Sequence, residues 1–293
     1  MEVHQLRYFC AVARHGTFTR ASEVEHVAQP SLSQQILKLE AELGARLFDR
    51  LPRSAKLTVF GKAFLPKAER ILRELEEARI ELQEMAGTER GSVTVGIIPT
   101  IAAYLLPKLL KGFAARHPQV AVTVVEDITP TLLQRLHDGT IDMAIVALPI
   151  TGNELASEEL FEEKFYAVLP EKHPRASRAS ISLPELNREP FLLLKEGHCF
   201  RDSLIDACNK SKMTPSVVFE SGQFATILAM VSAGMGVSAV PAMAVQPHKG
   251  CKFIPISGRH STRIVGLVTS RHHYQSRAQQ LLMTQMRDAC RDA

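Results

Sequence analysis

The sequence lacks the features of exported, membrane-spanning and strongly basic proteins. The residues after Met1 show neither the basic stretch nor the apolar core of a secretory signal, so we expect a cytoplasmic chain. The charge-free stretch 221–247 is interrupted by Gly234, Gly236 and Pro241, which argues against a membrane span and indicates a buried helix, a turn and a strand. The net charge is only +4, which permits a polyanionic partner without predicting one.

Cysteine is scarce, and its spacing argues against the common zinc motifs. The thiols are Cys10, Cys199, Cys208, Cys251 and Cys290, and the sequence contains no CxxC pair. We therefore expect no metal and no cofactor. Cytosolic thiols are reduced by default, so a disulfide here would be transient or part of a sensor. Cys10 falls on the apolar face of a predicted helix and is expected in the core, whereas Cys251 and Cys290 lack activating neighbours.

The first 60 residues carry short helical patterns followed by a basic turn. Apolar residues recur at helical spacing within 6–13, 18–24 and 32–43, and glycines end the first and third of these segments. The stretch 51–56, flanked by apolar residues, is typical of a hairpin tip. Three helices and a hairpin make a winged helix-turn-helix, which offers one helix to the major groove of double-stranded DNA and the hairpin to its backbone or minor groove.

Side chains at the start of the third helix are the candidates for contacts with bases and phosphates. Hydroxyl and amide groups there can bond base edges or phosphate oxygens. The candidates are Gln29, Pro30, Ser31, Ser33 and Gln34, with Pro30 suited to the first helical turn. In the hairpin, Arg50 and Arg53 suit phosphate contacts. Taken alone, this basic segment is equally well explained as a solvated loop with a few arginines.

A long helical pattern follows, at residues 61–87. After Pro66 it contains no proline or glycine until Gly87, and apolar residues from Phe64 to Met85 alternate in spacings of four and three. Such a heptad seam with charged flanks is typical of a helix that pairs with another helix. The pattern favours a homodimer contact over a surface helix that packs only on its own domain.

Residues 92–293 alternate between strand and helix patterns, which indicates parallel α/β units. They divide into two lobes, with about 92–161 and 269–293 in the first and about 162–268 in the second. A cleft between two such lobes is where ligands of these folds bind. We therefore predict an α/β chain that begins with an all-α winged helix-turn-helix (1–60), continues through the linker helix and ends in a two-lobed regulatory domain.

The order of residues is more specific than their charge. Residues 5–9 (QLRYF), 16–21 (GTFTRA), 29–36 (QPSLSQQI) and 47–50 (LFDR) resemble the N-terminal domain of LysR-type transcriptional regulators, and the resemblance extends over the whole chain. It implies regulatory lobes like those of a periplasmic binding protein. It also implies no enzymatic activity, homodimers through the linker helix, pairing into homotetramers on bent DNA, and RNA polymerase as a further partner.

Three residues depart from the pattern of that family. Ala28 stands where a serine or threonine would cap the third helix, and losing such a cap costs roughly 1 kcal/mol. Ala28 also removes a phosphate contact. Glu25 stands where leucine is common, and Phe60 where alanine is common. None of the three removes the fold.

Residues 197–202 (GHCFRD) carry the most distinctive chemistry outside the DNA-binding region. Cys199 is expected near a helix N-terminus with His198 and Arg201 beside it, and both kinds of neighbour lower the pKa of a thiol. A thiolate attacks peroxide, and a second thiol such as Cys208 can resolve the sulfenic acid. Nine residues along a helix span ~13 Å and two and a half turns. Because a disulfide needs Cα atoms within roughly 7 Å, pairing would require this helix to unwind.

This segment, together with Cys208, resembles the peroxide-sensing members of the LysR family. The resemblance implies a peroxidatic thiol at Cys199 and a resolving thiol at Cys208. Its implied peroxide-binding or polarising residues are Thr100, Thr129, His198 and Asp202, with Arg263 as a basic residue near the thiol. Each also has a structural interpretation: a helix cap for the threonines, a first-turn acid for Asp202, and a surface charge for Arg263.

The leading hypothesis is a LysR-type activator of oxidative-stress genes that senses hydrogen peroxide. The alternative is a LysR-type regulator that responds to a small metabolite in the cleft between the lobes. A thiol peroxidase is disfavoured, because the sequence shows no thioredoxin-like core with a CxxC motif and an enzyme needs no DNA-reading domain.

Overall fold

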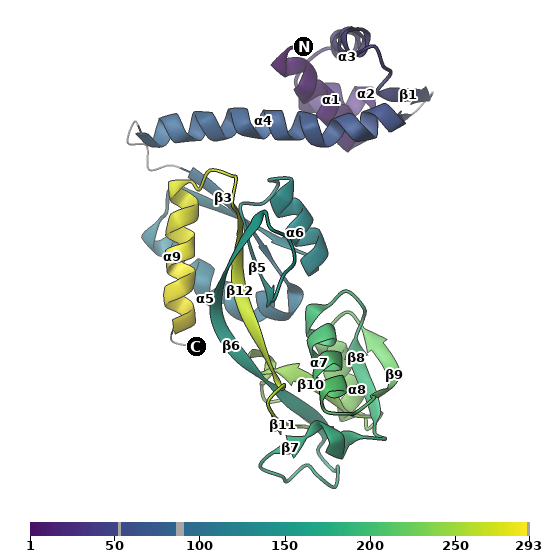
Figure 1. Cartoon of the computed structure of the whole chain (residues 1–293), viewed down its shortest axis with the longest axis vertical. Coiled ribbons are helices and arrows are strands. Elements are labelled where there is room, and N and C mark those ends of the chain that lie inside the picture. The colour runs from purple at the N-terminus through teal and green to yellow at the C-terminus, as the bar shows by residue number, and fades with distance from the viewer. Residues whose placement is uncertain (52–53, 86–90, 292–293) are drawn as a thin grey trace. The chain divides into compact units, whose positions relative to one another are not determined.

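The computed structural model describes all residues except 52–53, 86–90 and 292–293. The chain forms two compact units, Met1–Thr88 and Glu89–Ala293 (Figure 1). No helix in the described part of the chain is both long enough and apolar enough to cross a membrane.

The first unit is a winged helix-turn-helix followed by a long helix. Its elements are α1 (Val3–His15), α2 (Phe18–Val24), α3 (Gln29–Leu43), the antiparallel hairpin β1 (Phe48–Leu51) and β2 (Ser54–Leu57), and α4 (Val59–Met85). Phe9, Leu32, Ile36 and Leu39 are fully buried in its core. The apolar periodicity of the sequence therefore identified the buried faces of α1 and α3.

The long helix begins two residues before its predicted start at residue 61. The α4 helix starts at Val59 and continues through Pro66. The Thr58 side chain explains the start at Val59, because its hydroxyl accepts a hydrogen bond from the Gly61 amide at 3.0 Å and donates to the Arg46 carbonyl, in the loop before β1, at 2.7 Å. Gly61 must also lack a side chain, since a Cβ there would lie 2.1 Å from the Leu47 carbonyl oxygen. The predicted end of this helix at residue 87 lies outside the described residues.

The second unit contains a large mixed sheet and a small parallel one. Its first half comprises β3 (Gly91–Ile97), α5 (Pro99–Arg116), β4 (Val120–Glu126), α6 (Thr129–His137), β5 (Met143–Leu148) and β6 (Leu155–Pro170). Its second half comprises β7 (Ile181–Ser182), η1 (Leu183–Leu186), β8 (Pro190–Leu194), α7 (Cys199–Lys210), β9 (Ser216–Ser221), α8 (Phe224–Ser232), β10 (Ser238–Pro241), η2 (Ala242–Ala244), β11 (Cys251–Ser257), β12 (Thr262–Ser270) and α9 (Arg277–Arg291). The large sheet has the order β4-β3-β5-β12-β6-β11-β7, and β10 also pairs with β6.

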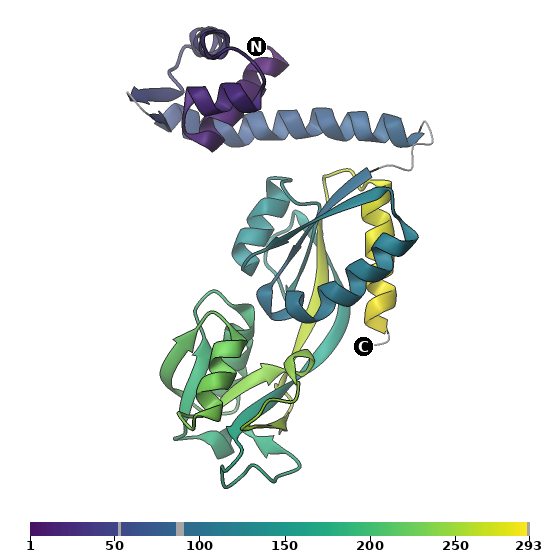
Figure 2. The same cartoon turned by 180° about the vertical axis from the view of Figure 1, so that it is seen from behind.

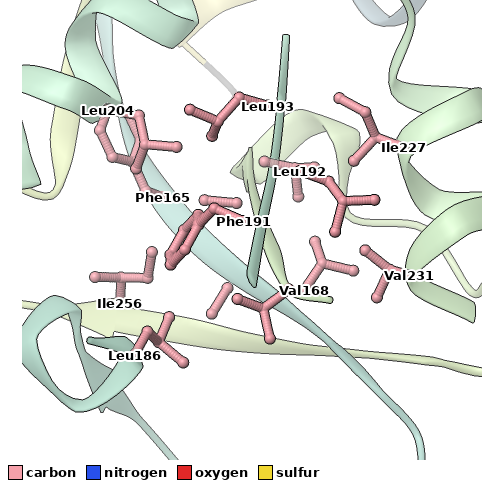
Figure 3. Close-up of a cluster of buried hydrophobic side chains, with 14 of the residues drawn as sticks. Phe165, Val168, Leu186, Phe191, Leu192, Leu193, Leu204, Ile227, Val231 and Ile256 are labelled. Carbon is pink, nitrogen blue, oxygen red and sulfur yellow. The ribbon is translucent and has the colours of Figure 1, made fainter. Parts of the chain in front are cut away.

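Two hydrophobic cores divide this unit into lobes. Lobe I is built around β3, β5, α5 and α9, which lie side by side in the view from behind (Figure 2). Lobe II is built around β8, α7 and α8, and its core includes Phe165, Phe191, Leu204 and Ile227 (Figure 3). The α/β expectation is confirmed, but the pairing is only partly parallel: β3 pairs in parallel with β4 and β5, whereas β12 is antiparallel to β5 and β6.

The antiparallel strands β6 and β12 connect the two lobes (Figure 1). The sequence predicts strands only at 165–169 and 264–268, and misses the first half of β6 because residues 156–164 there are largely polar. Along its length, β6 pairs with β12 at one end and with β10 and β11 at the other. Residues on these two strands can therefore contact both lobes.

Candidate functional site

The N-terminus of α3 presents the predicted DNA-contacting side chains to solvent. Gln29, Pro30, Ser31 and Gln34 are exposed and Ser33 is half-buried. Ala28 is the N-cap residue of α3 and makes no side-chain capping bond. Of the basic candidates, Arg50 lies in β1 and Arg53 lies outside the described residues.

The apolar seam of α4 is also open within its own unit. Ile71 is 37% exposed, Leu75 46% and Leu82 67%, whereas Ala68 nearer the start of the helix is buried against the winged domain. A leucine left this exposed on one helix face is typical of a surface that pairs with another helix.

Three helices begin around the Cys199 thiol. Cys199 is the first residue of α7, Thr129 the first of α6 and Thr100 the second of α5. These residues share a small space with Gly197 and His198, about 160 Å³ in extent and too narrow to hold a water molecule. Ile98 and Ile128 close it from the apolar side. Helix N-termini carry partial positive charge, so this arrangement favours an anion at the thiol position.

Neither threonine caps its helix. The cap positions are occupied by Ile98 and Ile128, so the helix-cap interpretation of Thr100 and Thr129 is wrong. The Thr100 hydroxyl is buried and bonded to an arginine. The hydroxyl oxygen of Thr129 is also buried, and among the described residues it has no partner at hydrogen-bonding distance.

A second, larger cavity also borders the Cys199 residue. It measures about 850 Å³ and is lined by residues of α6, the segment 147–155 and the first turns of α7. Cys199 and Asp202 both face it, together with Asp206 one turn further along. Asp202 is exposed, as expected for a first-turn acid. Cys199 therefore borders both the narrow space and the wide cavity.

Arg263 is not a surface charge: its side chain is 1% exposed. Its Nε lies 2.8 Å from a carboxylate oxygen of Glu163, which is 3% exposed. Nη1 donates to the Thr100 hydroxyl at 2.9 Å, and the guanidinium carbon lies 5.3 Å from the centre of the Phe200 ring. Glu163 was not predicted as a site residue. The one available signal is that Glu163 lies between Phe161 and Phe165 at strand spacing, on the inward face of β6.

The pKa of Cys199 is raised, so the expected depression of its pKa is wrong. Burial disfavours the thiolate and outweighs Arg263, the Thr129 hydroxyl and the Ala147 backbone, which all favour it. The Thr129 hydroxyl is near enough for this effect without forming a hydrogen bond of normal geometry.

The cations expected beside the thiol act elsewhere. The Arg201 guanidinium bonds the Leu194 carbonyl oxygen and Glu220. Burial lowers the pKa of His198, which keeps its ring neutral at pH 7. The Nδ1 atom of His198 is buried and has no hydrogen-bond partner among the described residues. Arg263, distant in sequence, is thus the cation that acts on Cys199.

Cys208 lies on the opposite face of α7. It is fully buried in the core of lobe II, and burial raises its pKa to about 11. Cys199, in contrast, packs against the core of lobe I. Both thiols are free and the helix between them is continuous. Cys10 is buried in the winged domain as expected, with its pKa raised to about 12 by burial.

A winged helix-turn-helix with a two-lobed α/β unit defines a DNA-binding regulator rather than an enzyme. Residues 3–62 match the profile of the bacterial regulatory helix-turn-helix proteins of the lysR family, and residues 86–291 match the LysR substrate binding domain. The chain therefore belongs to the LysR family of transcriptional regulators, whose members bind DNA and act as oligomers.

Among the similar proteins are several named as hydrogen peroxide-inducible genes activators, for example from Escherichia coli and, as a probable one, from Mycobacterium leprae. The chain is 33% identical over 271 residues to the DNA-binding transcriptional dual regulator OxyR of Escherichia coli, covering 92% of this chain and 89% of that one. A full-length OxyR variant from Pseudomonas aeruginosa is structurally similar, with a TM-score of 0.80, 32% identity and coverage of 99% and 95%. An OxyR mutant from Corynebacterium glutamicum with bound hydrogen peroxide has a TM-score of 0.64, 30% identity and coverage of 99% and 92%.

Proposed function

We propose that this LysR-type regulator senses hydrogen peroxide through Cys199 and activates oxidative-stress genes. The observation that carries the proposal is the half-buried thiol itself, placed where three helices begin, with Arg263 as its cation. The unpartnered Thr129 hydroxyl and His198 Nδ1 offer hydrogen bonds to a peroxide oxygen. Thr100 orients Arg263, and Asp202 faces the thiol from the wide cavity.

The chemistry consumes two thiols and one peroxide. The Cys199 thiolate attacks one oxygen of hydrogen peroxide, the O–O bond breaks, and the departing hydroxide takes a proton to become water. Cys208 then attacks the sulfur of the sulfenic acid, and the S–OH group leaves as a second water. The two sulfur atoms are each oxidised by one electron, and both peroxide oxygens end as water.

Formation of the disulfide would change the conformation of α7 and so switch the regulator between two states. Residues nine apart on an intact helix lie about 13.5 Å apart along its axis, too far for a disulfide. Unwinding α7 removes Cys208 from the core of lobe II while Cys199 leaves its contacts with lobe I. A change at one helix would thus alter the packing of both lobes, as expected of a bistable element.

The DNA-binding half of the mechanism rests on α3 and α4. We propose that Gln29, Pro30, Ser31, Ser33 and Gln34 contact the operator and that Arg50 and Arg53 contact its phosphates. The exposed seam of α4 pairs with a second copy, and two dimers form a tetramer that contacts RNA polymerase from DNA. Oxidation would act by changing the spacing between the paired recognition helices.

The test is mass spectrometry of the full chain after dilute peroxide, with free thiols alkylated before digestion. We expect a Cys199–Cys208 linked peptide and an altered DNA footprint. Cys199→Ser should abolish both, whereas Cys251→Ser, which removes another buried thiol, should abolish neither. Absence of the linked peptide would refute the proposal.

The second candidate is a regulator that binds a small metabolite in the wide cavity. The 850 Å³ volume is sufficient for such a ligand, and its wall combines apolar residues with the carboxylates of Asp202 and Asp206. A metabolite sensor would keep its DNA response in the Cys199→Ser variant, whereas a thiol sensor would lose it.

A further inference from the structure

The buried Arg263–Glu163 pair joins four elements next to the thiol. The two residues are directly opposite each other on the antiparallel strands β12 and β6. One Glu163 oxygen accepts from Arg263 Nε at 2.8 Å, and the other accepts from the Met243 amide in η2 at 2.8 Å. Arg263 extends the chain of contacts to Thr100 in α5 at 2.9 Å. The carboxylate is therefore held on one side by backbone and on the other by the guanidinium.

Stability alone does not explain why a charged residue occupies this buried position. An ion pair this deep is at best weakly stabilising, because both charges lose their hydration. Arg263 alone could interact with the Phe200 ring and Thr100, but its full positive charge would then act on Cys199 without compensation. The Glu163 carboxylate, which is bonded directly to the guanidinium, partly offsets this positive charge.

We propose that Glu163 is a positioning residue for the Cys199 thiol: it holds the Arg263 guanidinium against Thr100 and Phe200 and offsets the positive charge that Arg263 presents to the sulfur. The inference rests on the proposed function only in taking Cys199 as the reactive thiol. Glu163 thereby limits how strongly Arg263 favours the thiolate and so affects how easily the thiol becomes a nucleophile.

The other ionisable groups around the thiol do not replace this role. His198 is neutral at pH 7, and Asp202 carries a charge that opposes the thiolate from the exposed side. Tyr104, one turn beyond Thr100 on α5, has its pKa raised by burial and by Glu163, so it is also uncharged. Arg263 is the cation whose charge favours the thiolate, and Glu163 is its direct partner.

The measurement is the rate of Cys199 alkylation by iodoacetamide in the full chain as a function of pH, quantified by peptide mass spectrometry. Glu163→Gln keeps the size of the side chain and removes its charge. We expect the midpoint of the rate profile to move down by about 1 pH unit, the lower end of the shift that an uncompensated neighbouring cation produces. Alkylation below the midpoint should then be about tenfold faster.

The matched control is Glu162→Gln. Glu162 precedes Glu163 on the same strand, carries the same charge and is exposed on the other face of β6. This variant should leave the profile unchanged. A shift of equal size in both variants would mean that net charge alone is responsible and would overturn the proposal.

Repeating the measurement in a protein that lacks the Arg263 guanidinium tests whether Glu163 acts through Arg263. In an Arg263→Met protein, adding Glu163→Gln should move the midpoint by less than a third of its effect in the parent. A full shift in that background would overturn the positioning role. If Glu163→Gln does not fold, the Glu163→Asp variant is measured instead, because it keeps the carboxylate charge on a shorter side chain. Its midpoint should fall between those of the parent and Glu163→Gln, and an unchanged midpoint in whichever variant folds would contradict the proposal.

Failure of this proposal and failure of peroxide sensing give different results. Alkylation reports the thiol without any disulfide, so a shifted profile would stand even if peroxide produced no Cys199–Cys208 bond. Conversely, normal disulfide formation with an unshifted profile in Glu163→Gln would remove only the role of Glu163.

Discussion

Formation of a Cys199–Cys208 disulfide should unwind α7, and the free-energy cost of this unwinding can be worked out from the structure. Bringing residues from about 13.5 Å apart to within roughly 7 Å removes at least two helical turns. Four to six backbone hydrogen bonds are lost at roughly 1 kcal/mol each, and Cys208 leaves a fully buried site. A net penalty of about 5 kcal/mol raises the reduction potential of the disulfide by roughly 100 mV.

This cost can be tested by measuring the reduction potential of the disulfide. Structural disulfides have potentials below about −300 mV, so this one should lie near −200 mV, within reach of glutathione. Titration of the full chain against glutathione buffers, with the linked peptide measured by mass spectrometry, gives the potential directly. Hydrogen exchange should show that amides in the middle of α7 lose protection on oxidation, while a Cys208→Ala protein keeps them protected. A potential below about −300 mV, or a helix still protected in the oxidised protein, would refute the reasoning.

Three further predictions concern the cap of α3, the buried ion pair and the pH dependence of Cys199. Ala28→Ser should supply the missing cap of α3 and stabilise the winged domain by about 1 kcal/mol, measured by thermal unfolding; no gain would mean that the cap geometry is unsuitable. Arg263→Met should destabilise the protein by about 3–5 kcal/mol in urea because it leaves Glu163 buried and unpaired, and the double variant Arg263→Met/Glu163→Met should recover most of that loss. Because the pKa of Cys199 is raised above its usual value, its thiolate fraction is small at pH 7, and the peroxide reaction should accelerate about tenfold per unit between pH 7 and 8. The same shift means that Cys199 contributes stability that is present below pH 9 and lost as the pH rises further; a flat rate profile would contradict both statements.

The fold was largely predictable because helical and strand periodicities report burial directly. Leu32, Ile36 and Leu39 repeat at helical spacing and are all fully buried. The start of α4 at Val59 rather than at residue 61 was not predicted, because the Thr58 hydroxyl that caps the helix is held by the Arg46 carbonyl, in the loop before β1. The first half of β6 was missed for a similar reason: its side chains are polar, and its pairing with β12 comes from residues a hundred positions away.

The thiol site was predictable in its residues but not in its electrostatics. Residue order brought Thr129, His198 and Cys199 into consideration, and the structure gathers them in one small space. Neighbours in sequence gave the wrong cation, because Arg201 turns toward Glu220 whereas Arg263 arrives from β12. Burial is a property of the packed molecule, so a motif alone cannot give the sign of a pKa shift that burial dominates.

The raised pKa of Cys199 is compatible with the proposed peroxide sensing, because it would make the thiol selective in what it reacts with. The narrow space beside Cys199 cannot hold a water molecule, so a ligand reaches the sulfur only from the wide cavity or after a small local opening. In its resting form the thiol is protonated and half-buried, which reduces its reaction with bulky oxidants and with metal ions. A small peroxide that bonds the Thr129 hydroxyl and His198 Nδ1 would satisfy two buried polar atoms that otherwise lack partners among the described residues. Selectivity would then arise from the free energy of satisfying those atoms, and a larger alkyl hydroperoxide should react more slowly than hydrogen peroxide in the same assay.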